Sequence, residues 1–304
     1  MMWQKVWKSS QKQDISGLVP SLEHLPNIGE NEVLIKVYSV ESRASARLDF
    51  ILDEKAVVCT GFCGEVYQKG AAVTAFDIGD FVIGLTKALL TQTHLAEFFV
   101  ASVDLVLPMP GHLTVQQAAV LPISGLAVYQ LLQQMQISNK SVLVFGANVT
   151  IAHLLLEMGK HSAKSISIAV PAENTAQWVK DGISKDYLVA NFQDTPYDCI
   201  VDFSDLQDAV QLKKYLVDGG ALWKTNQPGW QWWTSFLNLF SSKKTKYYRL
   251  TINEIEFAEM AQKVQQWQLT PRIGTIINAD ELDHTIGRAL ADTETRALVL
   301  NFMV

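Results

Sequence analysis

Between residues 141 and 223 the chain alternates short apolar runs with longer stretches of helical periodicity. The apolar runs are 141–145, 165–170, 187–189, 199–202 and 221–223, and the helical windows are 151–161, 176–183 and 208–217. Strands that alternate with helices in this way form a parallel sheet with helices packed on its faces. The sequence therefore predicts an α/β fold with a doubly wound parallel sheet in this part of the chain.

The preceding part of the chain has a different pattern. Residues 33–40 place Val33, Ile35 and Val37 on one face, which predicts a half-buried strand, and residues 41–43 break this pattern. Brief apolar runs cut by glycine continue to residue 84 and predict a small β-barrel. Residues 77–80 read as a turn, and Thr114 with Gln117 reads as a capping box that begins a helix. A length of 304 residues also favours two domains.

Composition narrows the classes of function. The chain has 25 basic and 31 acidic residues, and this net charge of −6 argues against a surface built to bind nucleic acid. Cys59, Cys63 and Cys199 are too few for a disulfide framework and are expected to be small buried apolar residues. No signal-peptide pattern and no membrane-length apolar run is evident. A cytoplasmic location is the expectation that follows.

Several segments, in this order, resemble the medium-chain dehydrogenase/reductase superfamily and its zinc-independent, quinone oxidoreductase-like branch. They are 32–40 (EVLIKVYSV), 76–84 (FDIGDFVIG), 94–100 (HLAEFFV), 104–110 (DLVLPMP), 118–129 (AAVLPISGLAVY), 141–147 (SVLVFGA), 216–222 (LVDGGAL) and the pattern of 269–302. The resemblance implies a GroES-like β-barrel catalytic domain formed by residues 1–117 and 268–304. It also implies a Rossmann cofactor-binding domain formed by residues 118–267, with an active-site cleft where the two meet.

The resemblance also bears on metal binding. Zinc-dependent members of the superfamily have a cysteine, a histidine and a glutamate where this sequence aligns Arg43, Thr60 and Gly61. None of these three supplies a thiolate, imidazole or carboxylate ligand, which zinc requires. The cysteine-rich lobe that binds a structural zinc is missing too, because no cysteine lies between Cys63 and Cys199. No metal is therefore expected.

The phosphate-binding loop departs from the family pattern. Where relatives read G-A-x-G-G-V-G, this chain has Gly146, Ala147, Asn148, Val149, Thr150, Ile151 and Ala152. A glycine there lets the backbone approach the pyrophosphate, and Val149 is the most serious departure. Thr150 is expected either to donate a hydrogen bond to a phosphate or to cap the following helix. Residues 146–151, together with Phe203 and Thr225, form the predicted cofactor site.

Few of the other residues that contact the cofactor or the substrate in this family are present in the sequence. Residues 170–174 (VPAEN) offer neither an NAD nor an NADP signature, and NADPH is expected because the family usually uses it. Arg43 would face the cleft and polarise a substrate carbonyl, or else it is a surface arginine paired with Glu41 or Asp49. Tyr67 is a further polar candidate for a catalytic role.

Two features bear on assembly. Trp223, Trp230, Trp232 and Trp233 form an aromatic cluster near lysines, which suits a membrane surface, a substrate cleft, a domain junction or an oligomer contact. Residues 246–252 (KYYRLTI) resemble the edge strand through which family dimers join, so a homodimer is expected.

Two functions follow from these observations. The first is a zinc-independent oxidoreductase that transfers hydride from NADPH to a quinone, an enone or a related small carbonyl substrate. The second is a non-catalytic protein that keeps the two-domain fold, has a degraded dinucleotide site, and binds another ligand or a protein partner. The altered loop favours the second, and Gly146 with the cleft-forming segments favours the first.

Overall fold

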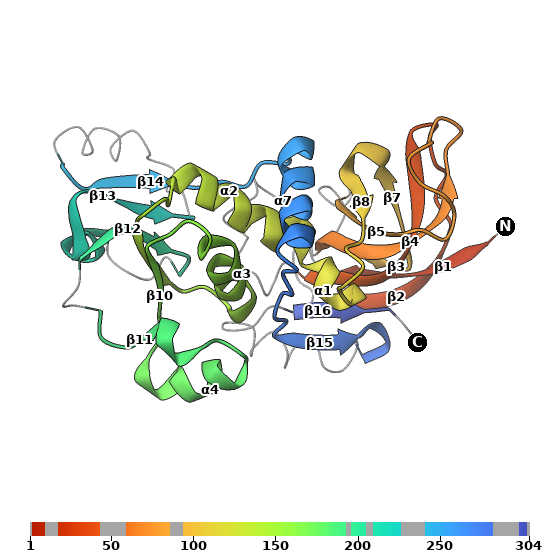
Figure 1. Ribbon diagram of the computed structural model, residues 1–304. Helices are drawn as coiled ribbons and strands as arrows, with labels where there is room; N and C mark the ends of the chain where they lie inside the picture. The colour runs from red at the N-terminus through yellow and green to blue at the C-terminus, as the bar shows by residue number, and fades with distance from the viewer. Residues whose placement is uncertain are drawn as a thin grey trace. The chain divides into compact units, whose positions relative to one another are not determined.

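The structure is a computed structural model that describes residues 2–9, 18–42, 59–85, 94–192, 196–204, 209–225, 241–281 and 298–302. The chain divides into two compact units. The first unit holds the described residues up to Leu126 and those from Ile252 onward, and the second holds the described residues of 127–251. Figure 1 shows both units along the chain.

The first unit is built on two sheets. One has the order β2 (Leu18–His24), β1 (Trp3–Ser9) and β6 (His94–Ala96). The other has the order β15 (Thr275–Asn278), β16 (Leu298–Asn301), β3 (Glu32–Ser42), β4 (Cys59–Lys69), β5 (Phe81–Leu85) and β8 (Val106–Pro108), with β7 (Phe98–Ser102) also paired to β3. All strand pairs are antiparallel except that of β15 with β16. Strands from the start and the end of the chain thus join in one sheet.

Strand β3 passes through the core of the first unit. Val33, Ile35 and Val37 belong to the buried cluster between strands, as their alternation predicts, but Leu34 is also fully buried. The prediction of a half-buried strand holds for residues 35–38, where Lys36 is exposed and Tyr38 is partly exposed, and it was wrong for Leu34 and for residues 39–41, which are all buried. Helix α1 (Val115–Ala119) packs against β3 and β4 and adds to the burial of the strand.

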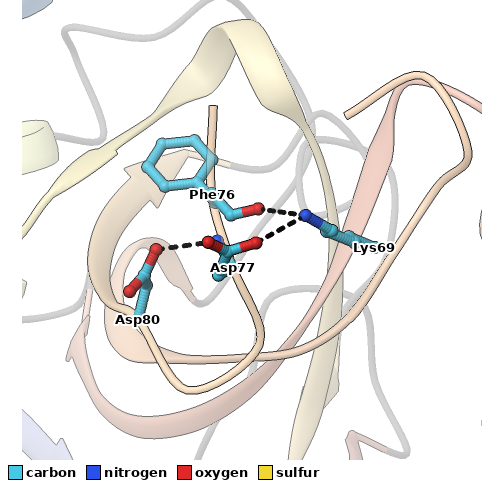
Figure 2. A network of polar contacts seen from close by, with 4 residues as sticks. All are labelled: Lys69, Phe76, Asp77 and Asp80. Carbon is cyan, nitrogen blue, oxygen red and sulfur yellow. Dashed lines mark hydrogen bonds and ion pairs between the residues drawn. The ribbon is translucent and has the colours of Figure 1, made fainter. Parts of the chain in front are cut away.

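Residues 77–80 form the predicted turn between β4 and β5, and Figure 2 shows its contacts. The Asp77 backbone N–H donates to Oδ2 of Asp80 at 2.8 Å, and Gly79 has a φ of +97°. Nζ of Lys69 donates to the Phe76 carbonyl and to Oδ1 of Asp77, each at 2.8 Å. The hydrogen bond from Lys69 lowers the pKa of the Asp77 carboxyl, which accordingly remains ionised.

A π-helical turn, η6 (Leu121–Gly125), connects α1 to α2 (Leu126–Met135). The predicted capping box is confirmed, since the Gln117 N–H donates to Oγ1 of Thr114 and the Thr114 N–H donates to the Gln117 side chain. Helix α7 (Glu254–Gln266) packs against η6, where a Cβ on Gly125 would lie 3.3 Å from the Met260 sulfur. Because of this packing α7 groups with the first unit, whereas the predicted boundaries at 117/118 and 267/268 assign its residues to the second domain.

The second unit is built on one parallel sheet of six strands. Its order is β11 (Leu188–Val189), β10 (Ser165–Ala169), β9 (Ser141–Phe145), β12 (Tyr197–Asp202), β13 (Leu216–Lys224) and β14 (Lys244–Tyr247). Every pair in the sheet is parallel. This confirms the fold class predicted from alternating strands and helices.

The helices of the second unit precede or lie between its strands in sequence. They are α2, α3 (Val149–Gly159), α4 (Thr175–Lys180) and α5 (Ala209–Leu212). Short 3-10 turns complete the chain of both units at η5 (Val103–Leu105), η7 (Ala172–Asn174), η8 (Lys185–Tyr187), η9 (Lys213–Tyr215) and η10 (Ala279–Glu281). One face of the sheet buries Leu143, Phe145, Ile200 and Leu222 in a single cluster.

The predicted edge strand at 246–252 differs from the structure. Strand β14 begins at Lys244 and ends at Tyr247. The Gln130 side chain accepts a hydrogen bond from the Thr251 N–H at 3.1 Å and donates to the Thr251 carbonyl at 2.8 Å. Both backbone hydrogen-bonding groups of Thr251 are therefore paired with a side chain and are not available to extend the sheet. The prediction was wrong for residues 248–252, although β14 does lie at one edge of the sheet.

Two of the three cysteines have described side chains, and both are buried free thiols. Sγ of Cys63 lies 3.3 Å from the Met109 sulfur, and burial raises the pKa of the Cys63 thiol to about 12. Burial also raises the pKa of Cys199. Both therefore act as small apolar residues at neutral pH, as predicted.

Candidate functional site

The carboxyl ends of β9, β12 and β13 bring most of the predicted cofactor residues together. Gly146 directly follows β9 and has a φ of +66°. A Cβ at this position would lie 2.4 Å from Cβ of Ser204 and 2.5 Å from its backbone nitrogen. Glycine is therefore required here by the close approach of the chain after β12, in addition to its backbone conformation.

Asn148 sets the start of helix α3. It is the N-cap residue, and its Oδ1 accepts the Ile151 N–H at 2.8 Å. Val149 and Thr150 are the first two helical residues and are 1% and 0% exposed. The interpretation of Thr150 as the cap was wrong, because the amide of Asn148 occupies that role two residues earlier. The side-chain oxygen of Asn148 thus occupies one of the helix N–H groups that would otherwise be available to bind a phosphate.

A polar cluster that sequence reasoning missed lies beside this turn. The Asp202 carboxylate ends β12 and is fully buried, and its Oδ1 accepts hydrogen bonds from the Ser204 N–H at 3.0 Å and hydroxyl at 2.6 Å. Its Oδ2 lies 3.6 Å from Nζ of Lys224 at the end of β13. The sequence does hold a signal for this cluster, because Asp202 and Lys224 lie at the ends of two predicted strands. Neighbouring parallel strands end at the same edge of a sheet, so the two side chains can be expected to lie close together.

Phe203 and Thr225 complete this edge. Phe203 donates its backbone N–H to the Phe145 carbonyl at 2.9 Å and is 3% exposed. Thr225 is 1% exposed, and its hydroxyl has no hydrogen-bond partner in the described part of the chain. A buried hydroxyl without a partner costs free energy, so this edge retains one polar group that a ligand can satisfy.

The two predicted catalytic residues belong to the first part of the chain. Arg43 lies outside the described residues. Tyr67 lies on β4, where its hydroxyl contacts the Met2 sulfur at 3.3 Å and its ring packs edge-on against Phe98. Both contacts are within the first unit, and neither of them assigns a catalytic role.

The first unit contains a buried acid that sequence reasoning treated as a break in a strand or as a surface partner of Arg43. Glu41 lies within β3 and is 2% exposed. Its Oε2 accepts the Ser124 N–H at 3.2 Å, and its Oε1 accepts the Ser124 hydroxyl. Burial raises the pKa of Glu41 to about 8, although both hydrogen bonds from Ser124 act in the opposite direction. The carboxyl is therefore mainly protonated at neutral pH.

The described residues can be compared with the requirements of a metal site and of a membrane-spanning helix. In the part of the chain that the structure describes, no three His, Cys, Asp or Glu side chains gather as metal ligands. Thr60 and Gly61, two of the three positions that align with zinc ligands, lie on β4. Among the described helices, none has the length and apolar character needed to span a membrane.

Sequence relatives point to reductases. No protein-family model matches the chain. It is 28% identical over 122 residues to a quinone-oxidoreductase homolog, chloroplastic, of Spinacia oleracea, covering 38% of this chain and 37% of that protein. It is 26% identical over 218 residues to the 2-methylene-furan-3-one reductase of Solanum lycopersicum, covering 65% of this chain and 55% of that protein. The chain thus spans about a third to a half of the length of these relatives.

Solved structures share the fold over almost the whole chain. The quinone oxidoreductase from Coxiella burnetii matches 99% of this chain and 100% of its own with a TM-score of 0.77 at 21% identity. The CAD from Helicobacter pylori, complexed with NADP(H), matches 99% of this chain and 98% of its own with a TM-score of 0.77 at 14% identity. The predicted two-part fold and the resemblance to the medium-chain dehydrogenase/reductase superfamily are confirmed.

Proposed function

From this superfamily resemblance we propose that the chain is an oxidoreductase that uses NADPH to reduce a quinone, an enone or a related carbonyl compound. The observation that supports this most directly is the sequence likeness to a protein named 2-methylene-furan-3-one reductase, which extends over 65% of the chain. The parallel sheet of the second unit supports it too, because nucleotide cofactors bind at the carboxyl ends of such strands.

The carboxyl edge of the sheet fits a dinucleotide in part. The turn at Gly146, the start of α3 and the buried hydroxyl of Thr225 are groups that would hold its phosphates and sugars. Lys224, which is 12% exposed, adds a cation at the same edge. A bound nicotinamide would supply the hydride. The misfit is at Asn148, whose amide already binds a helix N–H.

That misfit supports the second candidate, a non-catalytic protein with the same fold. An N-cap amide and buried β-branched residues replace the glycines of the family's loop at Asn148, Val149 and Thr150. With fewer donors and a stiffer loop, dinucleotide affinity would fall below a useful range. The chain would then bind a different ligand or a protein partner.

Calorimetric titration of the full chain with NADPH and with NADH separates the two candidates. The reductase predicts binding of NADPH below millimolar concentration, followed by oxidation of NADPH when a quinone or enone is added. If neither cofactor binds at millimolar concentration, the reductase proposal fails and the non-catalytic one stands.

Variants of the loop sharpen this test. Asn148→Gly should release the Ile151 N–H at little cost to the helix and tighten NADPH binding, whereas Asn148→Ser keeps a cap and should leave the affinity unchanged. Val149→Gly should also tighten binding, because it restores a family glycine at the first helical residue. Unchanged affinity in both glycine variants would mean that the pyrophosphate binds elsewhere.

The homodimer remains a proposal, and β14 supports it as an edge strand whose outer side is unpaired within the described sheet. Sedimentation of the wild type and a Tyr247→Pro variant tests it. Pro removes a backbone donor from the edge and should yield monomers. The cytoplasmic location stays a prediction.

A further inference from the structure

A cavity of about 400 Å³ lies in the second unit. Its lining includes Lys140 before β9 and Asp198 near the start of β12, together with residues along β13 and β14 such as Gly219, Trp223, Lys244 and Lys246. Gly146, Phe203 and Thr225 are absent from its described lining. The cavity is therefore separate from the predicted cofactor site, and its volume suits a small metabolite.

The sheet places the cavity's side chains in two rows. In the strand registers Cys199 pairs with Ala221, and Ala221 pairs with Lys244. Two residues further along, Trp223 pairs with Lys246. Because side chains alternate along a strand, Ala221, Trp223, Lys244 and Lys246 share one face of the sheet. Nζ of Lys246 lies 4.9 Å from the Trp223 ring centroid, so this lysine is held over the indole.

The backbone of β13 widens the cavity. Tyr197 of β12 pairs with Leu216, but Cys199 pairs with Ala221, so residues 217–220 bulge out of the ladder. Gly219 lies in this bulge with a φ of +82°, and no atom lies within 4 Å of where its Cβ would be. The bulged residues line the cavity and leave open space beside them.

The acidic groups at the cavity already have donors. Asp198 accepts hydrogen bonds from the Ser141 N–H and hydroxyl, each at 2.8 Å, and these bonds with nearby Lys164 and Lys140 lower the pKa of its carboxyl. Asp218 accepts the Ser242 hydroxyl at 3.3 Å. The carboxylates are thus partly neutralised by their own surroundings.

Several hydrogen-bond donors of the cavity have N–H groups that no described acceptor uses. In the described part of the chain Lys244 and Lys246 form no ion pair, and Lys140 uses one of its three N–H groups on the Met135 carbonyl at 2.9 Å. Trp223 is 5% exposed, and its indole N–H has no acceptor among the described residues. The described lining therefore holds three ammonium groups against two carboxylates, in addition to the buried indole donor.

We propose that this cavity binds a small multivalent anion, a phosphorylated or polycarboxylate metabolite. Lys140, Lys244 and Lys246 act as point charges around the anion, and the Trp223 N–H donates to one of its oxygens. The proposal does not depend on the reductase function, because the described lining of the cavity includes none of the predicted cofactor residues.

Calorimetry of the full chain at low ionic strength tests the proposal with two probes, inorganic pyrophosphate and citrate. Binding of pyrophosphate alone identifies a phosphate site, and binding of citrate alone identifies a carboxylate site. The double variant Lys244→Gln/Lys246→Gln should weaken the bound probe about tenfold or more, since two charge-assisted contacts are lost. Trp223→Phe, which keeps an aromatic ring and removes the N–H, should weaken it about threefold or more.

The matched control is Lys180→Gln/Lys185→Gln, which removes the same charge from exposed positions outside the cavity. This control should bind as the wild type does. The proposal is overturned if neither probe binds, if the control weakens binding as much as the cavity variants, or if both cavity variants bind with unchanged affinity. The last outcome would place the anion elsewhere, for example at the start of α3.

Discussion

The two units each bury a carboxyl group completely, but they stabilise it in different ways. Glu41 in the first unit receives two hydrogen bonds from Ser124 and has no ion pair among the described residues. Asp202 in the second unit receives two hydrogen bonds from Ser204 and has the Lys224 ammonium 3.6 Å away. Similar neutral donors are therefore present at both sites, and the difference is the cation.

That difference bears on the form in which Glu41 is buried. Desolvation without a cation favours the neutral acid, so Glu41 keeps its proton near neutral pH. A neutral acid can link β3 to the π-helical turn but contributes no charge. Asp202 and Lys224 form a buried ion pair at the strand edge where a dinucleotide would bind, and a pair of this kind can exchange its contacts for those of a charged ligand. The Glu41 site is thus suited to a structural role, and the Asp202–Lys224 pair is suited to interact with a charged ligand.

Among the variants that test this contrast, Glu41→Gln should change the free energy of unfolding the most, and the change should appear in how that free energy depends on pH. The pKa of Glu41 is about 8 in the folded chain and 4.5 in its absence, so the folded chain holds one more proton between these values. The free energy of unfolding therefore falls as pH rises through that window, by about 5 kcal/mol at about 1.4 kcal/mol per pKa unit. Glutamine mimics the neutral acid and should remove this part of the slope.

Urea unfolding of the wild type and Glu41→Gln at about pH 5 and about pH 8 measures this difference. The two proteins should have similar stability at the lower pH, and the variant should be the more stable at the higher pH. Equal slopes would show that Glu41 is ionised throughout, and the contrast with Asp202 would then disappear.

Lys224→Met should have the next largest effect. It removes the cation beside the buried Asp202 carboxylate while keeping an apolar stem of similar length. Loss of one partner of a buried pair leaves an uncompensated charge, and we expect the free energy of unfolding to fall by about 3 kcal/mol. Lys244→Met is the control, because Lys244 is exposed and should change stability by less than about 0.5 kcal/mol. A loss below that limit for Lys224→Met would make the cation irrelevant to the site.

These two carboxyls also show what the sequence could reveal. The strand that ends before Gly146 and the strand that ends at Asp202 were predicted because hydrophobic runs and helical periods are local patterns. Glu41 was misread as the end of a strand, since an acid inside an apolar run looks like a boundary. Its burial depends on Ser124, which lies 83 positions away, and no local pattern encodes that pairing. The Asn148 cap was missed because the family comparison directed attention to the missing glycines.

Gly146→Ala tests how the chain around Asp202 is held together. A methyl group here would meet Ser204, which donates both neutral hydrogen bonds to Asp202, and the backbone has a positive φ. We expect a loss of about 2 kcal/mol or more in the free energy of unfolding. Gly219→Ala is matched in φ at +82° but has open space, and should cost about 1 kcal/mol. Equal losses would mean that only the backbone conformation matters and that Ser204 adjusts freely.

Ser124→Ala should have the smallest effect, and it tests the neutral donors at Glu41. The hydroxyl bond is lost while the Ser124 N–H bond to Oε2 remains. Because that hydroxyl lowers the pKa of Glu41, its loss should raise the pKa further and cost about 1 kcal/mol of stability. The control is Ser39→Ala, which removes a buried hydroxyl bond to the Leu300 carbonyl and should cost a similar amount independently of pH. The cost of Ser124→Ala should instead grow as pH rises toward 8, since the hydroxyl stabilises the ionised carboxylate most. A cost that stays constant across this range would show that Ser124 only fills space beside Glu41, and the two units would then differ in packing and not in how they hold a charge.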